Sequence, residues 1–227
     1  MGLLGGFCKI LLEVKRLKAV LFDFDETLAK VNEELFAKNY FKNLQEFFST
    51  KGISANVQLI VSCIEHITVK ADGKRDNYDR FMSCFAAKTG RSDDFWENLF
   101  LEFYESRFFE DLKRHFRINT RIKDILESSK RNGLITVLAS NPIFPAIAVE
   151  KRLQWIGLNT DTFDLTTTME EFHYCKPDPR YYTEVCTKIG VDPEQCVMIG
   201  NDHKMDKACE KTGMKFIHVS ESENFVI

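Results

Sequence analysis

The chain has 227 residues, of which 44% are hydrophobic and 29% are charged, and its formal net charge is −3. This balance suits one large domain or a domain with an insertion, and it gives no basic footprint for nucleic acid or for an acidic membrane surface. The seven cysteines are odd in number and scattered without a CxxC pair. They predict reduced thiols in a cytoplasmic protein, without a disulfide framework or a zinc site.

The chain opens with MGLLGGFCKILLEVKRLKAV. A signal peptide is not predicted, because early positive charge and a small-residue cleavage site are both missing. Charged residues such as Lys9 and Glu13 interrupt any membrane span, and glycine at position 6 breaks the myristoylation pattern. The apolar residues between positions 11 and 17 instead predict a short amphipathic helix that lies on the body of the protein.

An apolar run at residues 18–24, KAVLFDF, predicts a buried strand. Three carboxylates, those of Asp23, Asp25 and Glu26, come at its end while the pattern is still apolar. Two interpretations remain open for this stretch alone. The strand either ends in a solvated acidic turn, or it delivers anionic groups to a site.

Residues 31–116 have a helical pattern, with aromatic and leucine residues recurring at spacings of three and four. An aromatic stripe of this kind is typical of packing rather than of a cofactor site. Polar or glycine-containing breaks divide the segment into about four helices, at residues 51–52, 71–76 and 89–94. The segment therefore predicts a small helical bundle.

After residue 116, predicted helices and strands alternate. The helices are expected at 120–130, 144–156, 179–189 and 205–212, and the strands at 134–141, 164–169, 196–201 and 215–220. Such alternation predicts an α/β, Rossmann-like parallel sheet with helices on both faces. The first strand is separated from the others by an inserted all-helical cap. The expected organisation is a core of residues 1–31 and 117–227, with 1–17 an N-terminal extension, and a helical cap of residues 32–116.

Polar side chains follow three of the predicted strands, in the stretches LFDFDET, LASN and MIGND. Ligands of open parallel sheets bind beyond the carboxyl ends of the strands. The sequence therefore predicts a site where these three stretches meet.

Four motifs in order resemble those of the haloacid dehalogenase superfamily, most closely its phosphatases with a helical cap inserted after the first motif. They are DFDET at 23–27, Ser140 and Asn141 in LASNP, Lys176 in CKPDPRYY, and GNDHKMD at 200–206. The resemblance runs from about residue 18 to the end, with the cap matched only in place and character. It implies a Mg²⁺-dependent hydrolase that acts on a small phosphate ester.

The chemistry of phosphoryl transfer explains the residue types of the first and third motifs. Asp23 can attack phosphorus and form an aspartyl-phosphate that water later hydrolyses. Asp25 can protonate the leaving oxygen and then activate the water. The resemblance implies that Lys176 pairs with both the phosphate and Asp23. A lysine and a cation beside Asp23 should lower the pKa of that carboxyl.

The resemblance also implies roles in binding. The carboxylate of Asp23 and the main-chain carbonyl of Asp25 would bind Mg²⁺. Thr27 would orient the loop, while Ser140 and the amide of Asn141 would hold phosphate oxygens.

The fourth motif departs from the family pattern, which usually begins Gly-Asp. Here Asn201 follows Gly200, and acids stand at Asp202 and Asp206. We expect Asp202 to be the metal ligand, because Mg²⁺ prefers carboxylate oxygen. Asn201 and Asp206 are the second choices.

Asp25 favours a phosphate ester over a haloacid, because the dehalogenases lack a carboxylate at this position. The unusual fourth motif keeps open a phosphate-binding regulatory protein with weak activity. A mutase or a phosphonatase also stays open, the latter because Lys38 and Lys42 stand one helical turn apart.

The sequence does not identify the substrate, and sugar phosphates, phosphoglycolate and nucleoside monophosphates all fit. It gives no indication of the oligomeric state. Candidates for substrate contacts from the cap are Asn32, Lys38, Lys42, Arg80 and Arg107.

Overall fold

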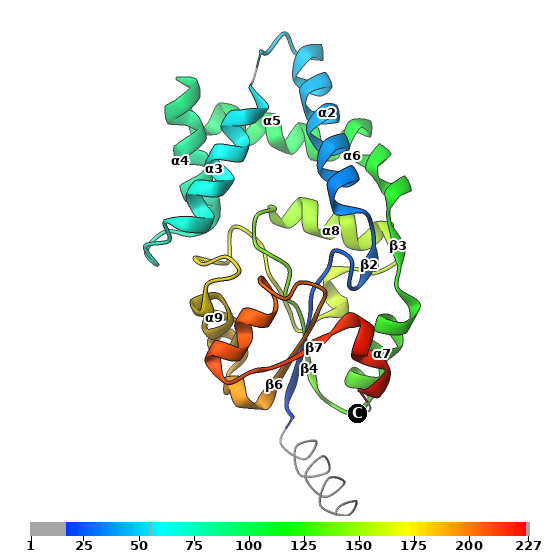
Figure 1. Ribbon diagram of the computed structural model, residues 1–227. Coiled ribbons are helices and arrows are strands. Elements are labelled where there is room, and N and C mark those ends of the chain that lie inside the picture. The colour runs from blue at the N-terminus through cyan, green and yellow to red at the C-terminus, as the bar shows by residue number, and fades with distance from the viewer. Residues whose placement is uncertain (1–16, 55, 226–227) are drawn as a thin grey trace, which may run out of the picture.

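The computed structural model describes residues 17–54 and 56–225. The predicted N-terminal amphipathic helix lies outside the described residues. Figure 1 shows a sheet with its covering helices in the lower half of the molecule and a group of helices above it. Helix α8 lies between the two parts.

The sheet has five parallel strands in the order β5-β4-β1-β6-β7, with β1 in the centre. Its strands are β1 (Ala19–Phe22), β4 (Ile135–Leu138), β5 (Leu165–Thr166), β6 (Cys196–Gly200) and β7 (Lys215–His218). Ala19 of β1 is aligned with Ile135 on one side and with Cys196 on the other. The predicted parallel sheet is confirmed, although the strand expected at 164–169 is only two residues long.

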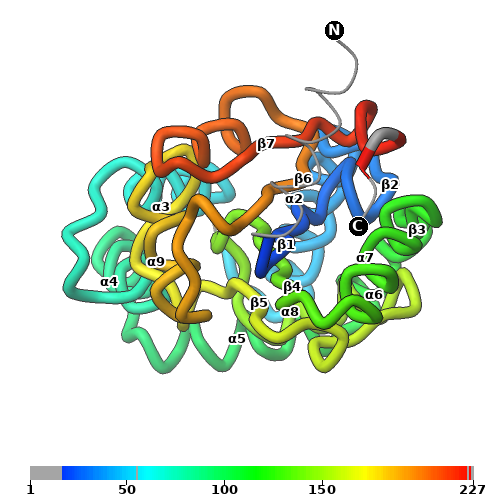
Figure 2. The backbone as a smooth tube through the Cα atoms, turned by 90° about the horizontal axis from the view of Figure 1, so that it is seen from below, coloured from blue at the N-terminus to red at the C-terminus, as the bar shows by residue number. Residues whose placement is uncertain are grey.

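Helices cover both faces of the sheet. The central strand β1 is therefore buried on both faces, which explains its continuously apolar sequence. Val20 and Phe22 of β1 belong to one hydrophobic cluster, whereas Ala19 and Leu21 belong to another on the opposite face. Figure 2 shows α7 and α9 on opposite sides of the strands. The covering elements are α7 (Thr120–Arg131) and α8 (Ala146–Trp155) on the first face, and α9 (Pro179–Ile189) and the 3-10 helix η4 (Lys207–Thr212) on the second.

The inserted helices lie between two short antiparallel strands, β2 and β3, in which Ala29 is aligned with Ile118. We keep the name cap for this predicted segment. In chain order the elements are β2 (Ala29–Lys30), α2 (Glu33–Thr50), α3 (Val57–Val69), α4 (Asn77–Thr89), α5 (Asp93–Glu105), α6 (Arg107–Glu110), η1 (Asp111–His115) and β3 (Arg117–Ile118). Further 3-10 turns are η2 (Thr160–Thr162), η3 (Pro193–Gln195) and η5 (Val219–Asn224). None of the helices in the described residues is both long and apolar enough to cross a membrane.

Aromatic packing holds the cap together and joins it to the core. Within the cap, the rings of Phe85 and Trp96 lie 4.7 Å apart, centroid to centroid. At the junction, Phe36 of α2 packs edge-on against Phe116 at 5.0 Å, and Phe116 packs against Trp155 of α8 at 5.1 Å. The aromatic residues are therefore packing residues, as their helical spacing predicts, and they continue the hydrophobic core from the sheet into the cap.

The start of α4 is fixed to the core through backbone atoms. The buried Asn77 donates its main-chain N–H to the Phe172 carbonyl at 2.8 Å. Arg80 is buried as well, and its guanidinium donates to the carbonyls of Ile67 and His173 at 3.0 and 3.2 Å. Arg80 is thus a structural residue that joins α3 and α4 to the loop before Lys176. From the sequence, it was one of the candidates for substrate contacts.

The prediction that every cysteine is a reduced thiol is wrong for one pair. Cys63 of α3 and Cys84 of α4 form a disulfide with a Cα–Cα distance of 5.8 Å. The two cysteines are 21 residues apart in sequence, and only the packing of α3 against α4 brings them together. The other cysteines in the described part of the chain are free: Cys175, Cys186, Cys196 and Cys209.

Candidate active site

Three residues predicted from different motifs meet at the carboxyl edge of the sheet. Asp23 directly follows β1, and its N–H donates to the Ile199 carbonyl of β6 at 2.9 Å. The Lys176 ammonium donates to Asp23 Oδ1 at 2.7 Å and to Asp206 Oδ1 at 2.5 Å. All three side chains are buried. One lysine is therefore held between two carboxylates, which leaves the buried cluster with one excess negative charge.

Burial shifts the pKa of Asp23 upward, and the second carboxylate of the cluster acts in the same direction. The pKa rises to about 7, because the loss of solvation, together with the charge of Asp206, outweighs the attraction of Lys176. Burial alone would lower the pKa of Lys176, but Asp206 and Asp23 raise it well above its usual value. The expected lowering of the pKa of Asp23 involves a cation as well as the lysine and stays a prediction, because the lysine alone does not produce it. A cation beside Asp23 would shift its pKa back toward the acid range.

The loop after β6 is shaped around Asp206. A Cβ atom on Gly200 would lie 2.2 Å from Asp206 Oδ2, so glycine is required for this approach. Asp206 Oδ2 also accepts the Asp202 N–H at 3.0 Å. Asp202 itself is exposed, and its carboxylate accepts the backbone N–H groups of Lys204 and Met205 at 2.6 and 2.8 Å.

The side chain of Asn201 faces the first motif. Its Oδ1 accepts the hydroxyl of the buried Thr27 at 3.3 Å, and Asn119 donates to the Thr27 carbonyl at 2.9 Å. The backbone carbonyl of Asn201 lies 2.9 Å from His218 Nε2. These contacts favour the alignment in which Asn201, and not Asp202, takes the place of the usual acid. The identity of the metal ligand stays a prediction.

The oxygen atoms around Asp23 fit a hard divalent cation. Among the described residues, no three acidic, histidine or cysteine side chains converge as a metal-binding group. A set made of the Asp23 carboxylate, the Asp25 carbonyl and the Asn201 amide oxygen would still be all oxygen, and Mg²⁺ commonly completes such a set with water. The excess negative charge of the Asp23–Lys176–Asp206 cluster favours a cation at the same place.

The loop after β4 is attached to the loop that carries Lys176. The carbonyl of Ser140 accepts the hydroxyls of Thr167 and Tyr181 at 2.7 and 2.8 Å. Asn141 Oδ1 accepts the Lys176 N–H at 3.1 Å. Ser140 and Asn141 thus lie at the same edge of the sheet as Lys176, as predicted, and their roles toward phosphate stay predictions.

Sequence reasoning missed Arg152, which forms an ion pair with Asp25 Oδ1. Its guanidinium is buried among aromatic rings, 4.6 Å from the centroid of Phe24 and 4.7 Å from that of Phe144. Arg152 lies next to Leu153 on the buried side of α8. An arginine on the apolar side of a predicted helix was the one signal in the sequence that pointed to a buried partner.

Glu33, in the first turn of α2, was also missed. Its pKa is raised to about 7, mainly by desolvation and in addition by the carboxylates of Asp25, Glu26 and Asp202, although the side chain keeps access to solvent. An acid directly after a helix N-cap is usually explained by the helix dipole. Here the same position also faces the acidic edge of the sheet.

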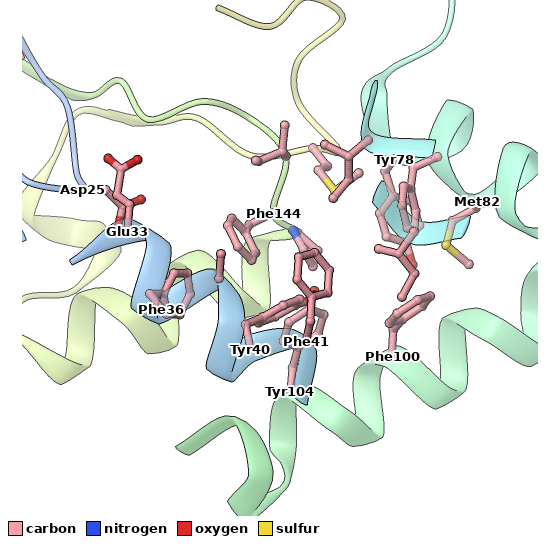
Figure 3. A pocket seen from close by; sticks show the side chains of 17 residues that line it. Asp25, Glu33, Phe36, Tyr40, Phe41, Tyr78, Met82, Phe100, Tyr104 and Phe144 are labelled. Carbon is pink, nitrogen blue, oxygen red and sulfur yellow. The ribbon is translucent and has the colours of Figure 1, made fainter. Parts of the chain in front are cut away.

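A cavity of about 230 Å³ lies between the core and the cap and begins at Asp25 and Glu33 (Figure 3). None of the cap residues expected to contact substrate lines it, namely Asn32, Lys38, Lys42, Arg80 and Arg107. Lys38 is exposed, and Lys42 lies 3.7 Å from Glu46 on the outer side of α2. No observation therefore favours the cap lysine that a phosphonatase needs.

The chain is similar to known proteins in sequence and in fold. The model of the haloacid dehalogenase-like hydrolases matches residues 17–207. The glyceraldehyde 3-phosphate phosphatase of Methanothermobacter thermautotrophicus is 27% identical over 191 residues, which cover 84% of this chain and 79% of that protein. The pyrophosphatase PpaX of Bacillus mycoides is 19% identical over 206 residues, covering 90% and 84%. The crystal structure of a HAD family enzyme from Bacteroides thetaiotaomicron, in complex with magnesium and inorganic phosphate, has the same fold, with a TM-score of 0.54 at 17% identity and coverage of 89% and 93%.

Proposed function

The chain belongs to the haloacid dehalogenase-like hydrolase family and is a phosphatase of that family, and from this premise we propose that it hydrolyses a small phosphate monoester in a Mg²⁺-dependent reaction. The observation that carries the proposal is the buried Asp23–Lys176–Asp206 cluster at the edge of the sheet. Asp25 stands between this cluster and the cavity.

In the first step, a carboxylate oxygen of Asp23 attacks phosphorus, and the bond between phosphorus and the leaving oxygen breaks. Lys176 holds the attacking carboxylate in place and pairs with the phosphoryl oxygens. Asp25 gives its proton to the leaving oxygen, so the alcohol leaves neutral. In the second step, Asp25 takes a proton from water and the water oxygen attacks phosphorus. The bond between phosphorus and the Asp23 oxygen breaks, which releases inorganic phosphate and restores the Asp23 carboxylate.

Arg152 is proposed as the positioning residue for Asp25. Its guanidinium is fixed by the rings of Phe24 and Phe144, so it holds one oxygen of Asp25 in a set direction. The same positive charge stabilises the carboxylate that forms when Asp25 has given up its proton.

The remaining residues bind and orient. Thr27 fixes the loop after β1 through Asn201, while Ser140 and the amide of Asn141 would receive phosphoryl oxygens. Asp23, the Asp25 carbonyl and Asn201 would hold Mg²⁺. The ion, when bound, would neutralise charge on the phosphoryl oxygens.

The proposal can be tested with an aryl phosphate, with Mg²⁺ present or removed by EDTA. Turnover should require Mg²⁺, and Asp23→Asn should lower it by roughly 10⁴-fold or more, because an amide cannot attack phosphorus. Circular dichroism should show that the variant is folded. Glu26→Gln is the matched control, since it changes an exposed acid of the same loop to an amide and should keep activity.

Turnover that survives in Asp23→Asn contradicts the covalent mechanism. Turnover that is equal in EDTA contradicts the metal requirement. Phosphate binding without any turnover would support the regulatory alternative.

A further inference from the structure

The cavity beside Asp25 is built mainly of hydrocarbon and aromatic side chains. Its volume of about 230 Å³ is roughly that of eight water molecules in the liquid. Figure 3 shows Asp25 and Glu33 at one end, the rings of Phe144 and Tyr40 in the middle, and Met82 at the other end. The walls come from α2, α3, α4, α5 and the loop before α8.

The tyrosine hydroxyls in the walls already have partners. Those of Tyr40 and Tyr104 bond to each other at 2.9 Å, and burial raises the pKa of Tyr40 to about 12, so its hydroxyl is neutral. Burial and the neighbouring Glu97, which accepts a hydrogen bond, raise the pKa of Tyr78. Among the described residues that line the cavity there is no lysine, arginine, histidine or side-chain amide.

These walls discriminate against polar groups. A hydroxyl that enters such a cavity out of reach of the tyrosine hydroxyls loses its water without gaining a side-chain partner, which lowers affinity roughly ten- to a hundredfold. Each buried methylene raises affinity by about fourfold. The two ionisable groups at the cavity mouth, Asp25 and Glu33, are both acids, so neither would attract a second anionic group on the substrate.

We propose that this cavity receives the organic group of the substrate, and that the substrate is the phosphate monoester of an apolar alcohol, a ring or chain of about six to ten carbon atoms. The assignment rests on the proposed phosphatase function, because it places the leaving oxygen at Asp25 and the phosphoryl group at Asp23. When the bond between phosphorus and oxygen breaks, the oxygen takes the proton of Asp25. The neutral alcohol then lies in the apolar cavity.

The first test compares kcat/KM for methyl, butyl, hexyl and octyl phosphate with that for glycerol phosphate, glucose 6-phosphate and phosphoglycolate. We expect kcat/KM to rise by about two- to fourfold for each methylene until the cavity is filled. Octyl phosphate should exceed the three hydrophilic esters by roughly a hundredfold or more.

The second test places a polar group in the cavity. Ile64→Gln, on the cavity side of α3, should lower kcat/KM for octyl phosphate by roughly tenfold and leave methyl phosphate unchanged. Val69→Gln is the matched control, because Val69 lies on the same helix, is 78% exposed and does not line this cavity. It should change neither value.

A third measurement does not depend on phosphoryl transfer. 2-Naphthol is added in the presence of EDTA, and its binding is measured by the shift in melting temperature. It should raise the melting temperature of the parent and of Val69→Gln but not that of Ile64→Gln.

The outcomes separate the two proposals. Hydrolysis of glycerol phosphate or glucose 6-phosphate as fast as that of octyl phosphate overturns the apolar substrate and leaves the phosphatase function standing. Binding of 2-naphthol with no hydrolysis of any ester overturns the phosphatase function, and the substrate assignment falls with it. Equal effects of Ile64→Gln and Val69→Gln overturn the role of the cavity.

Discussion

The edge of the sheet and the cavity under the cap are built on opposite principles. At the edge, Asp23, Lys176 and Asp206 are buried, and the one lysine lies within hydrogen-bond distance of both carboxylates. In the cavity, rings and hydrocarbon provide the surface, and the tyrosine hydroxyls are paired. The two regions share one catalytic side chain, that of Asp25.

This difference predicts how each region responds to substitution. Removing the lysine at the edge leaves two buried carboxylates without their cation, which costs far more stability than the pairs themselves contribute. Removing apolar surface in the cavity lowers the affinity for an apolar substrate in proportion to the contact area lost. Substitutions at the edge should therefore affect every substrate alike, whereas substitutions in the cavity should change the ranking of substrates.

The largest effect is expected from Lys176→Met. Both Asp23 and Asp206 would lose their cation, and we expect the free energy of unfolding to fall by about 3–5 kcal/mol. Turnover should fall by roughly 10³-fold or more with methyl and octyl phosphate alike, since phosphoryl oxygens lose a positive charge. Steady-state kinetics and denaturant unfolding measure both changes.

Lys188→Met is the control, because Lys188 lies at the surface, 3.5 Å from Glu171, and should change neither quantity appreciably. A loss limited to octyl phosphate in Lys176→Met would contradict the division between edge and cavity.

The next effect concerns the metal. If Asn201 is the ligand, Asn201→Ala should raise the Mg²⁺ concentration for half-maximal rate by roughly 10–100-fold, as substitutions close to a metal commonly do. Asp202→Ala should raise it much less, because that carboxylate bonds to the N–H groups of its own turn. Magnesium titrations of both variants rank the two residues. The opposite ranking would return Asp202 to the first place.

The residues at the edge of the sheet could be predicted from the sequence, because short patterns along the chain determine them. Asp23 follows an apolar run, and parallel strands bring their carboxyl ends to one edge. Arg152, Glu33 and the Cys63–Cys84 disulfide depend on how helices pack against each other, which no local spacing records. The aromatic spacing of the cap predicted packing correctly, but it could not tell which rings face the cavity.

A smaller effect is expected from the disulfide, which joins two helices of the cavity wall. Ile64 of α3 and Met82 of α4 both line the cavity, close in sequence to Cys63 and Cys84. A disulfide between residues 21 positions apart lowers the conformational entropy of the unfolded chain, which stabilises the folded state by about 3 kcal/mol. Because the bridge also joins two helices of the cavity wall, the variant with Cys63→Ser and Cys84→Ser should pack this wall less tightly and raise KM for octyl phosphate by roughly two- to fivefold, the cost of losing about one methylene contact.

Dithiothreitol provides the control for this prediction. It should raise KM for octyl phosphate in the parent and have no effect on the double variant. An equal change of KM for methyl phosphate would mean that the bridge supports the edge of the sheet and not the cavity wall.

The smallest effect concerns the stability of the protein in EDTA. The pKa of Asp23 in the folded protein is about 7, above its usual value of 3.8, so the folded state binds its proton more tightly than the unfolded state. The contribution of Asp23 to the free energy of unfolding therefore falls as the pH rises from about 4 to about 7. Asp23→Asn carries no such charge and leaves Lys176 paired with Asp206. The variant should melt above the parent at pH 8, by roughly the 2–4 °C that 1 kcal/mol gives in a domain of this size.

At pH 5 most of this difference should be gone, because Asp23 in the parent is then protonated. Added Mg²⁺ should stabilise the parent more than the variant and reverse the order at pH 8, since only the parent offers a carboxylate to the ion. Asp124→Asn, an exposed acid of α7, should show neither effect. A variant that melts below the parent in EDTA at both pH values would mean that Lys176 stabilises the Asp23 anion by more than burial opposes it. The edge of the sheet would then be stable with its charged groups in the absence of a metal.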